Sequence, residues 1–246
     1  MIKQKMIYGI HAVAEALDAA VDLDKIYVKK RSDNLELMAI AKQARLHSIP
    51  LFEVPNERLD RFTRGSHQGV VALLSPVTYS RLDLLIPSLF EEGRLPFVVV
   101  LDGITDVRNF GAIARTCECA GVDAIVIPDK GSVSVSADAV NASAGALMRI
   151  PVCRERNLVA TCRYLSESGL ALVGASEKSS VQFTKTNLTG PIALVMGAED
   201  RGISPAVLRQ LGQVVAIPQS GSVGSLNVSV ACGIILYEII RQRESF

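Results

Sequence analysis

Tryptophan is absent from this chain of 246 residues, and aromatic residues make up only 5% of it. This scarcity disfavours a nucleic-acid-binding protein that stacks bases on many aromatic rings. An excess of either charge is lacking too, because 26 basic and 25 acidic residues leave a net charge of +1, which excludes a strongly basic tail or an acidic coat. Although 49% of the residues are hydrophobic, no run of about 18 apolar residues occurs, so we expect a cytoplasmic protein without a membrane span.

Histidine is confined to the first quarter of the chain, as His11, His47 and His67. A Ser-His-Asp or Cys-His catalytic centre built only from later residues is therefore excluded. The five cysteines are odd in number and form no CxxC pair, which argues against a disulfide framework and a zinc site. We expect no metal, and we expect these cysteines to be small buried residues: Cys117, Cys119, Cys153, Cys162 and Cys232.

Two common nucleotide-binding patterns are missing as well. No GxxxxGK[ST] occurs, and no GxGxxG follows the first apolar strand of the later chain, so a P-loop and the usual dinucleotide fingerprint are excluded. The later chain instead alternates short apolar runs with helical patterns. This alternation predicts a parallel sheet covered by helices.

The chain divides into two α/β parts. Residues 1–75 form a compact unit that ends at Ser75-Pro76, and residues 76–95 carry two prolines and mixed charges, which predicts a linker with room for one short helix. Residues 96–246 form the larger part. In the first part we expect helices over 9–20, 35–47 and 56–62 and strands over 25–29, 51–54 and 70–74. In the second part we expect strands over 96–101, 124–127, 170–174, 192–196 and 214–217 and helices over 110–120, 137–147, 158–167, 205–211 and 226–241.

Three polar segments directly follow apolar strands of the second part, over residues 102–111, 197–202 and 218–227. Ligands of parallel α/β sheets bind at the carboxyl ends of the strands. The segments therefore predict a pocket rich in backbone donors and acceptors, with Arg115 and Glu199 at its rim, which suits a polar ligand of little net charge. Two structural alternatives stay open: Asn109 could cap the helix that follows it, and Arg115 could be an ordinary surface residue.

The same segments resemble the three motifs of the SpoU/TrmH family of SPOUT RNA 2′-O-methyltransferases. Asn109-x-Gly111-x-x-x-Arg115 is similar to the first motif, and Val195-Met196-Gly197-x-Glu199-x-x-Gly202-Ile203 to the second. The third is matched by Ile217-Pro218, by Ser225-Leu226-Asn227-Val228-Ser229-Val230-Ala231 and by Leu236-Tyr237-Glu238. Near the amino terminus, Tyr8-Gly9-Ile10-His11-Ala12-Val13 and His67-Gln68-Gly69-Val70-Val71-Ala72 resemble the substrate-binding domain of the RlmB type of bacterial 23S rRNA guanosine-2′-O-methyltransferase.

The resemblance implies a fold, a cofactor and partners. It implies a small ribosomal-protein-like α/β domain for RNA binding, then a parallel-sheet α/β SPOUT methyltransferase domain with a C-terminal trefoil knot. It also implies S-adenosyl-L-methionine as cofactor, 23S rRNA as substrate, and a homodimer whose active sites are completed across the interface. The catalytic residues it implies are Arg115, Asn109, Glu199, Ser225 and Asn227, and the cofactor-binding residues are Gly197, Ile217 and Leu226.

The reaction implied is attack of a ribose 2′-oxygen on the methyl group of a sulfonium. The resemblance assigns activation to Arg115, yet a guanidinium stays protonated in proteins. Arg115 could be a base in a perturbed site, or it could orient a phosphate and stabilise the forming alkoxide, and we favour the second role. Three other functions stay open: a tRNA guanosine-2′-O-methyltransferase, a catalytically inactive RNA-binding relative, and a cytosine C5-methylase that uses Cys117 or Cys119.

Two further features concern partners. The expected helix over 226–241 is apolar on more than one face, which predicts burial on several sides and a homodimer, with the core helix of a monomer as the alternative. Basic residues of the first part predict contacts with RNA phosphates, with an ordinary solvated surface as the alternative. These residues are Lys25, Lys29, Lys30, Arg31, Arg58, Arg61 and Arg64.

Overall fold

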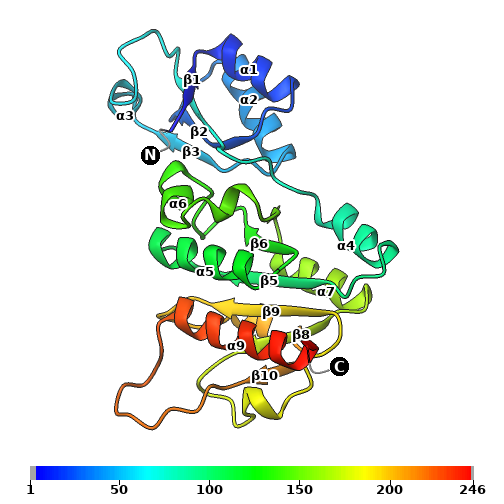
Figure 1. Cartoon of the computed structure of the whole chain (residues 1–246). Coiled ribbons are helices and arrows are strands. Elements are labelled where there is room, and N and C mark those ends of the chain that lie inside the picture. Colours follow the sequence, from blue (N-terminus) through cyan, green and yellow to red (C-terminus); the bar gives the residue numbers. More distant parts are fainter. Residues whose placement is uncertain (1–3, 245–246) are drawn as a thin grey trace. The chain divides into compact units, whose positions relative to one another are not determined.

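The computed structural model describes residues 4–244, which form two compact units (Figure 1). The first unit comprises the chain up to Thr78 together with the segment Ser134–Asp138. The second comprises Tyr79–Val133 and the chain from Ala139 onward. None of the helices among the described residues is both long enough and apolar enough to cross a membrane.

The first unit is built on a four-stranded sheet of order β1-β4-β2-β3, in which β2 and β3 are parallel and the other pairs antiparallel. Helices α1 and α2 cover one face, where Val13, Ile26 and Ile40 are buried. The other face carries a smaller cluster around Tyr27 and Leu59. The elements are β1 (Met6–Tyr8), α1 (Ile10–Asp18), β2 (Leu23–Lys29), α2 (Leu35–Leu46), β3 (Leu51–Val54), α3 (Asn56–Asp60) and β4 (Val70–Leu74).

Every helix and strand expected in the first unit is present. Strands β3 and β4 begin and end where they were predicted, because each is a short run between turn residues. Strand β1 was not expected. It has only three residues, which is too short for an alternating pattern to show.

The second unit is built on a six-stranded sheet of order β10-β8-β9-β5-β6-β7, with all neighbours parallel. The predicted parallel sheet covered by helices is therefore confirmed. The strands are β5 (Phe97–Asp102), β6 (Ala124–Pro128), β7 (Val152–Glu155), β8 (Ala171–Ala175), β9 (Ile192–Gly197) and β10 (Gln213–Val215). The helices are α4 (Leu82–Glu91), α5 (Val107–Cys119), α6 (Ala137–Ala142), α7 (Leu158–Glu167), α8 (Pro205–Leu208) and α9 (Val228–Glu244), with 3₁₀ turns at Ala146–Met148 and Phe183–Lys185.

Helices cover both faces of this sheet, because its central strands are apolar on both sides. In β5, Val98 and Val100 belong to the core cluster shared with α4, α7 and α8. The alternate residues Val99 and Leu101 are also fully buried and face the other side. Helices α5 and α9 pack against each other on that side (Figure 1).

Helix α4 lies within residues 76–95, the segment that we predicted as a linker. Its Leu82, Ile86 and Leu89 are buried in the core cluster of the second unit. Proline at position 87 stands inside the helix, which continues to Glu91. The prolines of this segment therefore do not prevent helix formation.

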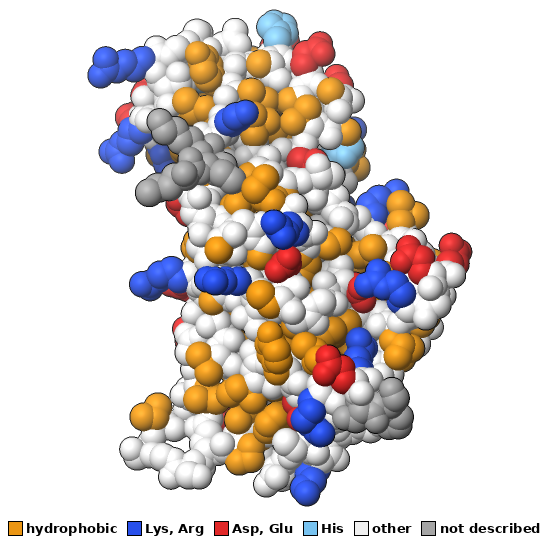
Figure 2. All heavy atoms as spheres, viewed as in Figure 1, with side chains coloured by type: hydrophobic (Ala, Val, Ile, Leu, Met, Phe, Trp, Pro, Cys, Tyr) orange, Lys and Arg blue, Asp and Glu red, His pale blue; other side chains and the backbone are white. Residues whose placement is uncertain are grey.

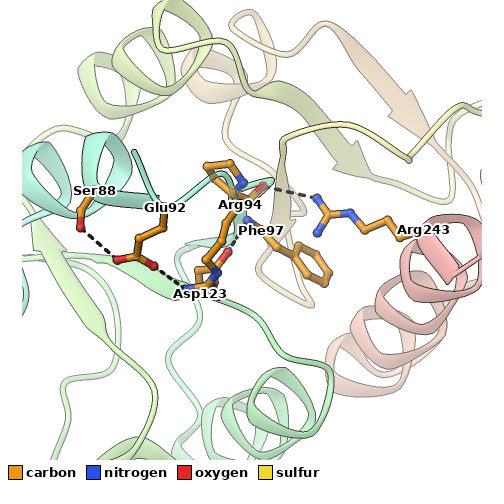
Figure 3. A network of polar contacts seen from close by, with 7 residues as sticks. Ser88, Glu92, Arg94, Phe97, Asp123 and Arg243 are labelled. Atoms are coloured by element: carbon orange, nitrogen blue, oxygen red, sulfur yellow. Dashed lines mark hydrogen bonds and ion pairs between the residues drawn. The ribbon is translucent and has the colours of Figure 1, made fainter. Parts of the chain in front are cut away.

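A polar network holds the amino end of β5 (Figure 3). The carboxylate of Asp123 accepts the Phe97 N–H at 2.8 Å and is paired with Arg94. The Arg243 guanidinium lies 4.7 Å from the centre of the Phe97 ring and donates to the Gly190 carbonyl at 2.7 Å. The end of α9 is thereby tied to the edge of the sheet opposite the polar segments.

Several elements of the second unit differ from the prediction. Strand β7 was not expected, because its sequence Val-Cys-Arg-Glu is half polar. Helix α6 stops at Ala142 instead of residue 147, since Ala144 and Gly145 take φ angles of 52° and 86° that no α-helix accommodates. Helix α8 ends at Leu208. Helix α9 begins at Val228, two residues late, and runs on to Glu244.

Candidate active site

The three polar segments meet at one edge of the six-stranded sheet. Strands β5, β9 and β10 end at Asp102, Gly197 and Val215, and each polar segment begins at or shortly after one of these ends. Because all six strands are parallel, their carboxyl ends lie along the same edge. Residues that are far apart in the sequence are thus brought together there.

Asn227 stands at the start of α9 and acts as its N-cap. Its Oδ1 accepts the Ser229 N–H at 2.9 Å and the Ser229 hydroxyl at 2.5 Å. The Val230 N–H donates to the same oxygen at 3.4 Å. The cap satisfies backbone N–H groups that the first turn of a helix leaves without partners, and it explains why α9 begins at Val228.

The other end of the Asn227 amide joins the remaining two segments. Its Nδ2 donates to Asn109 Oδ1 at 2.9 Å and to Glu199 Oε1 at 2.6 Å. The same Glu199 oxygen accepts the Val228 N–H at 3.3 Å. A carboxylate at this position is favoured by the partial positive charge of the α9 N-terminus. Both polar atoms of the Asn227 side chain are therefore engaged, and together they link all three segments and hold the amide in one orientation.

Asn109 is not the cap of α5, which corrects one of our two structural alternatives. Asp106 is the cap, and its Oδ1 accepts the N–H groups of Arg108 at 2.7 Å and Asn109 at 3.0 Å. The helix consequently starts at Val107, three residues earlier than predicted. The Asn109 side chain is then available to accept from Asn227.

Two glycines of the motifs are needed for close approach. A Cβ atom at Gly197 would lie 2.1 Å from the Gly202 carbonyl carbon and from the Ile203 nitrogen, so the loop that carries Glu199 could not fold back over β9. A Cβ atom at Gly111 would lie 2.5 Å from the Cβ of Ala142, which sets the packing of α5 on α6. Backbone atoms cannot move aside at such distances without distorting the loop.

A cavity opens beside this hydrogen-bonded group, at the ends of β8, β9 and β10. It encloses about 600 Å³, including the part that is open to solvent. All three predicted cofactor-binding residues line it, namely Gly197, Ile217 and Leu226, and so do two predicted catalytic residues, Glu199 and Ser225. Asn227 and Asn109 do not line the cavity. Asn227 donates a hydrogen bond directly to Glu199, and Asn109 is connected to Glu199 through Asn227.

The lining is suited to a ligand with an apolar ring and a polar, cationic tail. Met196, Val215, Ala231 and Ile235 supply an apolar wall, and carboxylates stand at Glu177 and Glu199. These residues fit the S-adenosyl-L-methionine that the sequence resemblance implies, whose adenine is flat and weakly polar and whose sulfonium is positive.

Sequence reasoning missed part of the lining. Ser176 and Glu177 directly follow β8 and line the cavity, and neither lies in a predicted polar segment. The rule that ligands bind at the carboxyl ends of strands applies to the predicted strand over 170–174 as well and would have found them both. Val228 and Ala231 lie in the segment that resembles the third motif, whereas Ile235 had no such sign, because on a helix it resembles an ordinary core residue.

Arg115 is the predicted catalytic residue that the structure does not bring to the cavity. It lies on the exposed side of α5, six residues after Asn109, and does not line the cavity. Within residues 4–244, its guanidinium has neither a hydrogen bond nor an ion pair. Six residues of helix correspond to about 9 Å along the axis, so Arg115 lies well separated from Asn109 on the same helix.

The cysteines are mostly core residues, as expected, with one exception. Cys117, Cys153, Cys162 and Cys232 are buried, whereas Cys119 is exposed near the end of α5. Burial raises the pKa of the Cys117 thiol well above its ordinary value, and contact with Cys232 raises it further. A buried thiol with a raised pKa is a poor nucleophile, which weakens the cytosine C5-methylase alternative. Among the described residues no cluster could hold a metal ion.

Most of the predicted basic residues of the first unit are exposed. Lys29, Lys30 and Arg31 are exposed at the end of β2, and so are Arg58, Arg61 and Arg64 around α3. Lys25 differs, because its Nζ lies 3.4 Å from the carboxylate of the buried Asp24. Lys25 is thus engaged within the fold and is the weakest candidate for RNA contact.

Comparisons with known proteins match both units. The model of the SpoU rRNA Methylase family matches residues 96–237, and that of the RNA 2′-O ribose methyltransferase substrate binding family matches residues 6–80. The chain is 35% identical over 242 residues to the 23S rRNA (guanosine-2′-O-)-methyltransferase RlmB of Escherichia coli, covering 97% of this chain and 99% of the relative. It is 37% identical over 244 residues to the protein of the same name from Photorhabdus laumondii, covering 98% and 99%.

The structure is similar to solved methyltransferase structures as well. The AdoMet-bound rRNA methyltransferase from Sinorhizobium meliloti superposes with a TM-score of 0.62 at 26% identity, covering 97% of this chain and 87% of that one. The SpoU methyltransferase AviRb from Streptomyces viridochromogenes has a TM-score of 0.63 at 22% identity, covering 99% and 92%, and supports the fold alone. With matching motifs, matching fold and family models that together span residues 6–237, the chain belongs to the SpoU rRNA methylase family.

Proposed function

We propose that this protein is a methyltransferase that uses S-adenosyl-L-methionine to methylate the ribose 2′-hydroxyl of a guanosine in 23S rRNA, in the cytoplasm. The observation that carries the proposal is the Asn227 amide, which joins Asn109, Glu199 and the start of α9 beside the cavity. The full-length similarity to two enzymes named for guanosine-2′-O-methylation of 23S rRNA supports the choice of substrate.

The cavity beside Glu199 is the proposed cofactor site. Backbone groups at Gly197, Ile217 and Leu226 cradle the adenosine, and Glu177 and Glu199 offset the positive charge of the ligand. When bound, S-adenosyl-L-methionine supplies an electrophilic methyl group on a sulfonium. Ser225, at the mouth of the same cavity, is placed to contact the ribose that enters.

The protein's own contribution is positioning and charge. Asn227 and Asn109 hold the loop of Glu199 against α9, so that the cavity keeps its shape when the RNA arrives. Arg115 carries a permanent positive charge and is assigned to orient a phosphate and to stabilise the forming 2′-alkoxide. A guanidinium acts here as an electrostatic group and not as the base that removes the proton.

The reaction is tested with labelled cofactor and a 23S rRNA transcript. Replacing the target guanosine by its 2′-deoxy form is expected to remove all methyl incorporation, because the accepting oxygen is gone. The matched control carries the 2′-deoxy substitution at a neighbouring nucleotide and should be methylated normally. Label on the base, or label that survives the deoxy substitution at the target, would contradict the proposed chemistry.

The site is proposed to be completed in a homodimer. Val230 and Tyr237 of α9 are 50% and 53% exposed, and a spacing of seven residues puts them on one face of the helix. Figure 2 shows hydrophobic side chains at the surface over the region of α9. Arg115 is exposed on α5, which packs beside α9, so a partner seated on α9 would lie close to the helix that carries this guanidinium.

Light scattering at micromolar concentration is expected to give twice the chain mass of 26.4 kDa. Tyr237→Glu should shift the protein toward the monomer, because a charge would then be buried in the interface. Leu84→Glu at an exposed position of α4 serves as the control for adding a carboxylate elsewhere on the second unit. A monomeric wild-type protein would contradict the dimer.

The first unit is proposed to supply RNA affinity and no catalytic group. Lys29→Ala/Lys30→Ala is expected to raise the Kd for rRNA and to lower the slope of log Kd against log salt by about 0.7 per lost phosphate contact. Turnover at saturating RNA and the KM for S-adenosyl-L-methionine should stay unchanged. Lys42→Ala/Arg45→Ala on the exposed side of α2 is the charge-matched control. Equal salt slopes for the two double variants would contradict this role.

A further inference from the structure

A second cavity lies at the same edge of the six-stranded sheet, where β5, β6 and β7 end. It encloses about 640 Å³, including space open to solvent, and is lined by residues that follow these strands, among them Gly103, Lys130 and Arg156. The strand order changes direction beside it, because β6 and β7 lie on one side of β5 while β9 and β8 lie on the other. Such a switch point is where parallel α/β sheets bind ligands.

The charge of this cavity is positive. Its lining contains three basic side chains, Lys130, Arg156 and Arg201, and one carboxylate, Asp102. That carboxylate is already engaged, since its Oδ2 accepts the Ser204 N–H at 2.7 Å. The start of α7 also lines the cavity, and the first turn of this helix contains no acidic residue, so its positive end is not offset there.

Arg201 reaches into the cavity because Gly103 has no side chain. A Cβ atom at Gly103, whose φ is +80°, would lie 2.7 Å from Arg201 Nη2. Within residues 4–244, neither Arg201 nor Lys130 is held by an ion pair. Both cations are exposed and therefore remain available to a ligand.

One loop separates this cavity from the proposed cofactor site. Ala198, Glu199 and Gly202 line the cofactor cavity, whereas Arg201 of the same loop lines the second one. The loop is closed by hydrogen bonds from Gly202 N–H to the Ala198 carbonyl at 2.8 Å and from Ala198 N–H to the Gly202 carbonyl at 3.2 Å. A ligand in the second cavity would therefore lie close to the reacting groups.

We propose that the second cavity binds a backbone phosphate of the substrate RNA near the methylated nucleotide, an inference that rests on the proposed function. Guanidinium and ammonium groups around an open cavity match a phosphodiester that passes over the surface. Its lining contains no aromatic ring that would stack the base of a free nucleotide. The cavity thus sets the position of the RNA strand while Glu199 and Asn227 shape the cofactor side.

The test compares two double variants of the full-length protein in steady-state methyl transfer to a 23S rRNA transcript. Lys130→Ala/Arg201→Ala is expected to raise the KM for RNA about tenfold or more, because two charge-assisted contacts are lost. Its KM for S-adenosyl-L-methionine should stay within about twofold of wild type, since neither residue lines the cofactor cavity. The control is Arg163→Ala/Arg209→Ala, which removes two exposed cations of α7 and the end of α8.

Four outcomes separate the possibilities. A raised KM for RNA with a salt slope lowered by about 0.7 per contact supports the phosphate site, and Arg201→Lys should then restore part of the affinity. Equal KM values for RNA in the two double variants would overturn the phosphate site. Competition by guanosine monophosphate that is abolished only in Lys130→Ala/Arg201→Ala would also overturn it, because such competition indicates a site for a free nucleotide. Absence of methyl transfer by the wild-type protein would instead contradict the proposed function itself.

Discussion

Replacing Arg115 by alanine is expected to abolish methyl transfer while the affinity for S-adenosyl-L-methionine changes little. Arg115 is exposed on α5 and does not line the cofactor cavity, so its loss leaves that cavity intact. Removing one group that stabilises a developing oxyanion costs roughly 100- to 1000-fold in kcat. Single-turnover rates and equilibrium binding of the cofactor measure the two effects separately.

Arg163→Ala on α7 is the control, because it removes an exposed arginine of the same unit. A rate for Arg115→Ala above about a tenth of wild type, which corresponds to less than about 1.4 kcal/mol in the barrier, would rule out a central role. Full loss of cofactor binding would instead mean that Arg115 holds the fold of the site.

Mixing two inactive variants would show whether Arg115 serves its own cavity or that of a partner. Arg115→Ala and Asn227→Ala damage different parts of the site. If the arginine acts across the interface, each mixed dimer contains one undamaged site, and random mixing should restore about a quarter of wild-type activity. If it acts within one chain, every site in the mixture carries a defect and no activity returns.

Asn227→Ser is expected to lower kcat by about 100-fold with little change in stability. Serine is a good N-cap, so the start of α9 should keep its cap. The donor Nδ2, which joins Asn109 and Glu199 at 2.9 and 2.6 Å, is lost. A displacement of about 1 Å in positioning groups is enough for a rate loss of this order.

Asn227→Ala provides the matched comparison, because it removes both the bridge and the cap. Its free energy of unfolding should fall by about a further 1 kcal/mol relative to Asn227→Ser. Thermal unfolding and kcat are measured on both variants. Wild-type activity in Asn227→Ser would show that the residue only caps the helix and that the bridge has no part in the reaction.

The starts of helices α8 and α5 depend on different kinds of information. Ser204 and Pro205 predicted the start of α8 correctly, because Pro at the first helical position is a local property of the sequence. The start of α5 was misplaced, since both Asp106 and Asn109 are capping residues and only the fold shows which side chain bonds the backbone. The break after α6 followed from the backbone angles of Ala144 and Gly145.

The amino-acid sequence alone determined the order of the strands and helices apart from β1 and β7, the parallel character of the second sheet and the three motif segments. These depend on neighbours within a few residues, on apolar runs and on turn residues, which a sequence displays directly. The absence of histidine after residue 67 was equally plain and excluded whole classes of catalytic centre.

Only the tertiary structure decided which of those residues act together. The bond between Asn227 and Asn109 joins positions 118 apart, and the bond between Ser204 and Asp102 joins positions 102 apart. No local pattern specifies such pairs, because they follow from the strand order that places distant strand ends at one edge. For the same reason, only the structure shows that Arg115 does not line the cofactor cavity. The cations of the second cavity come from three separate loops, so their grouping is visible only in the folded chain.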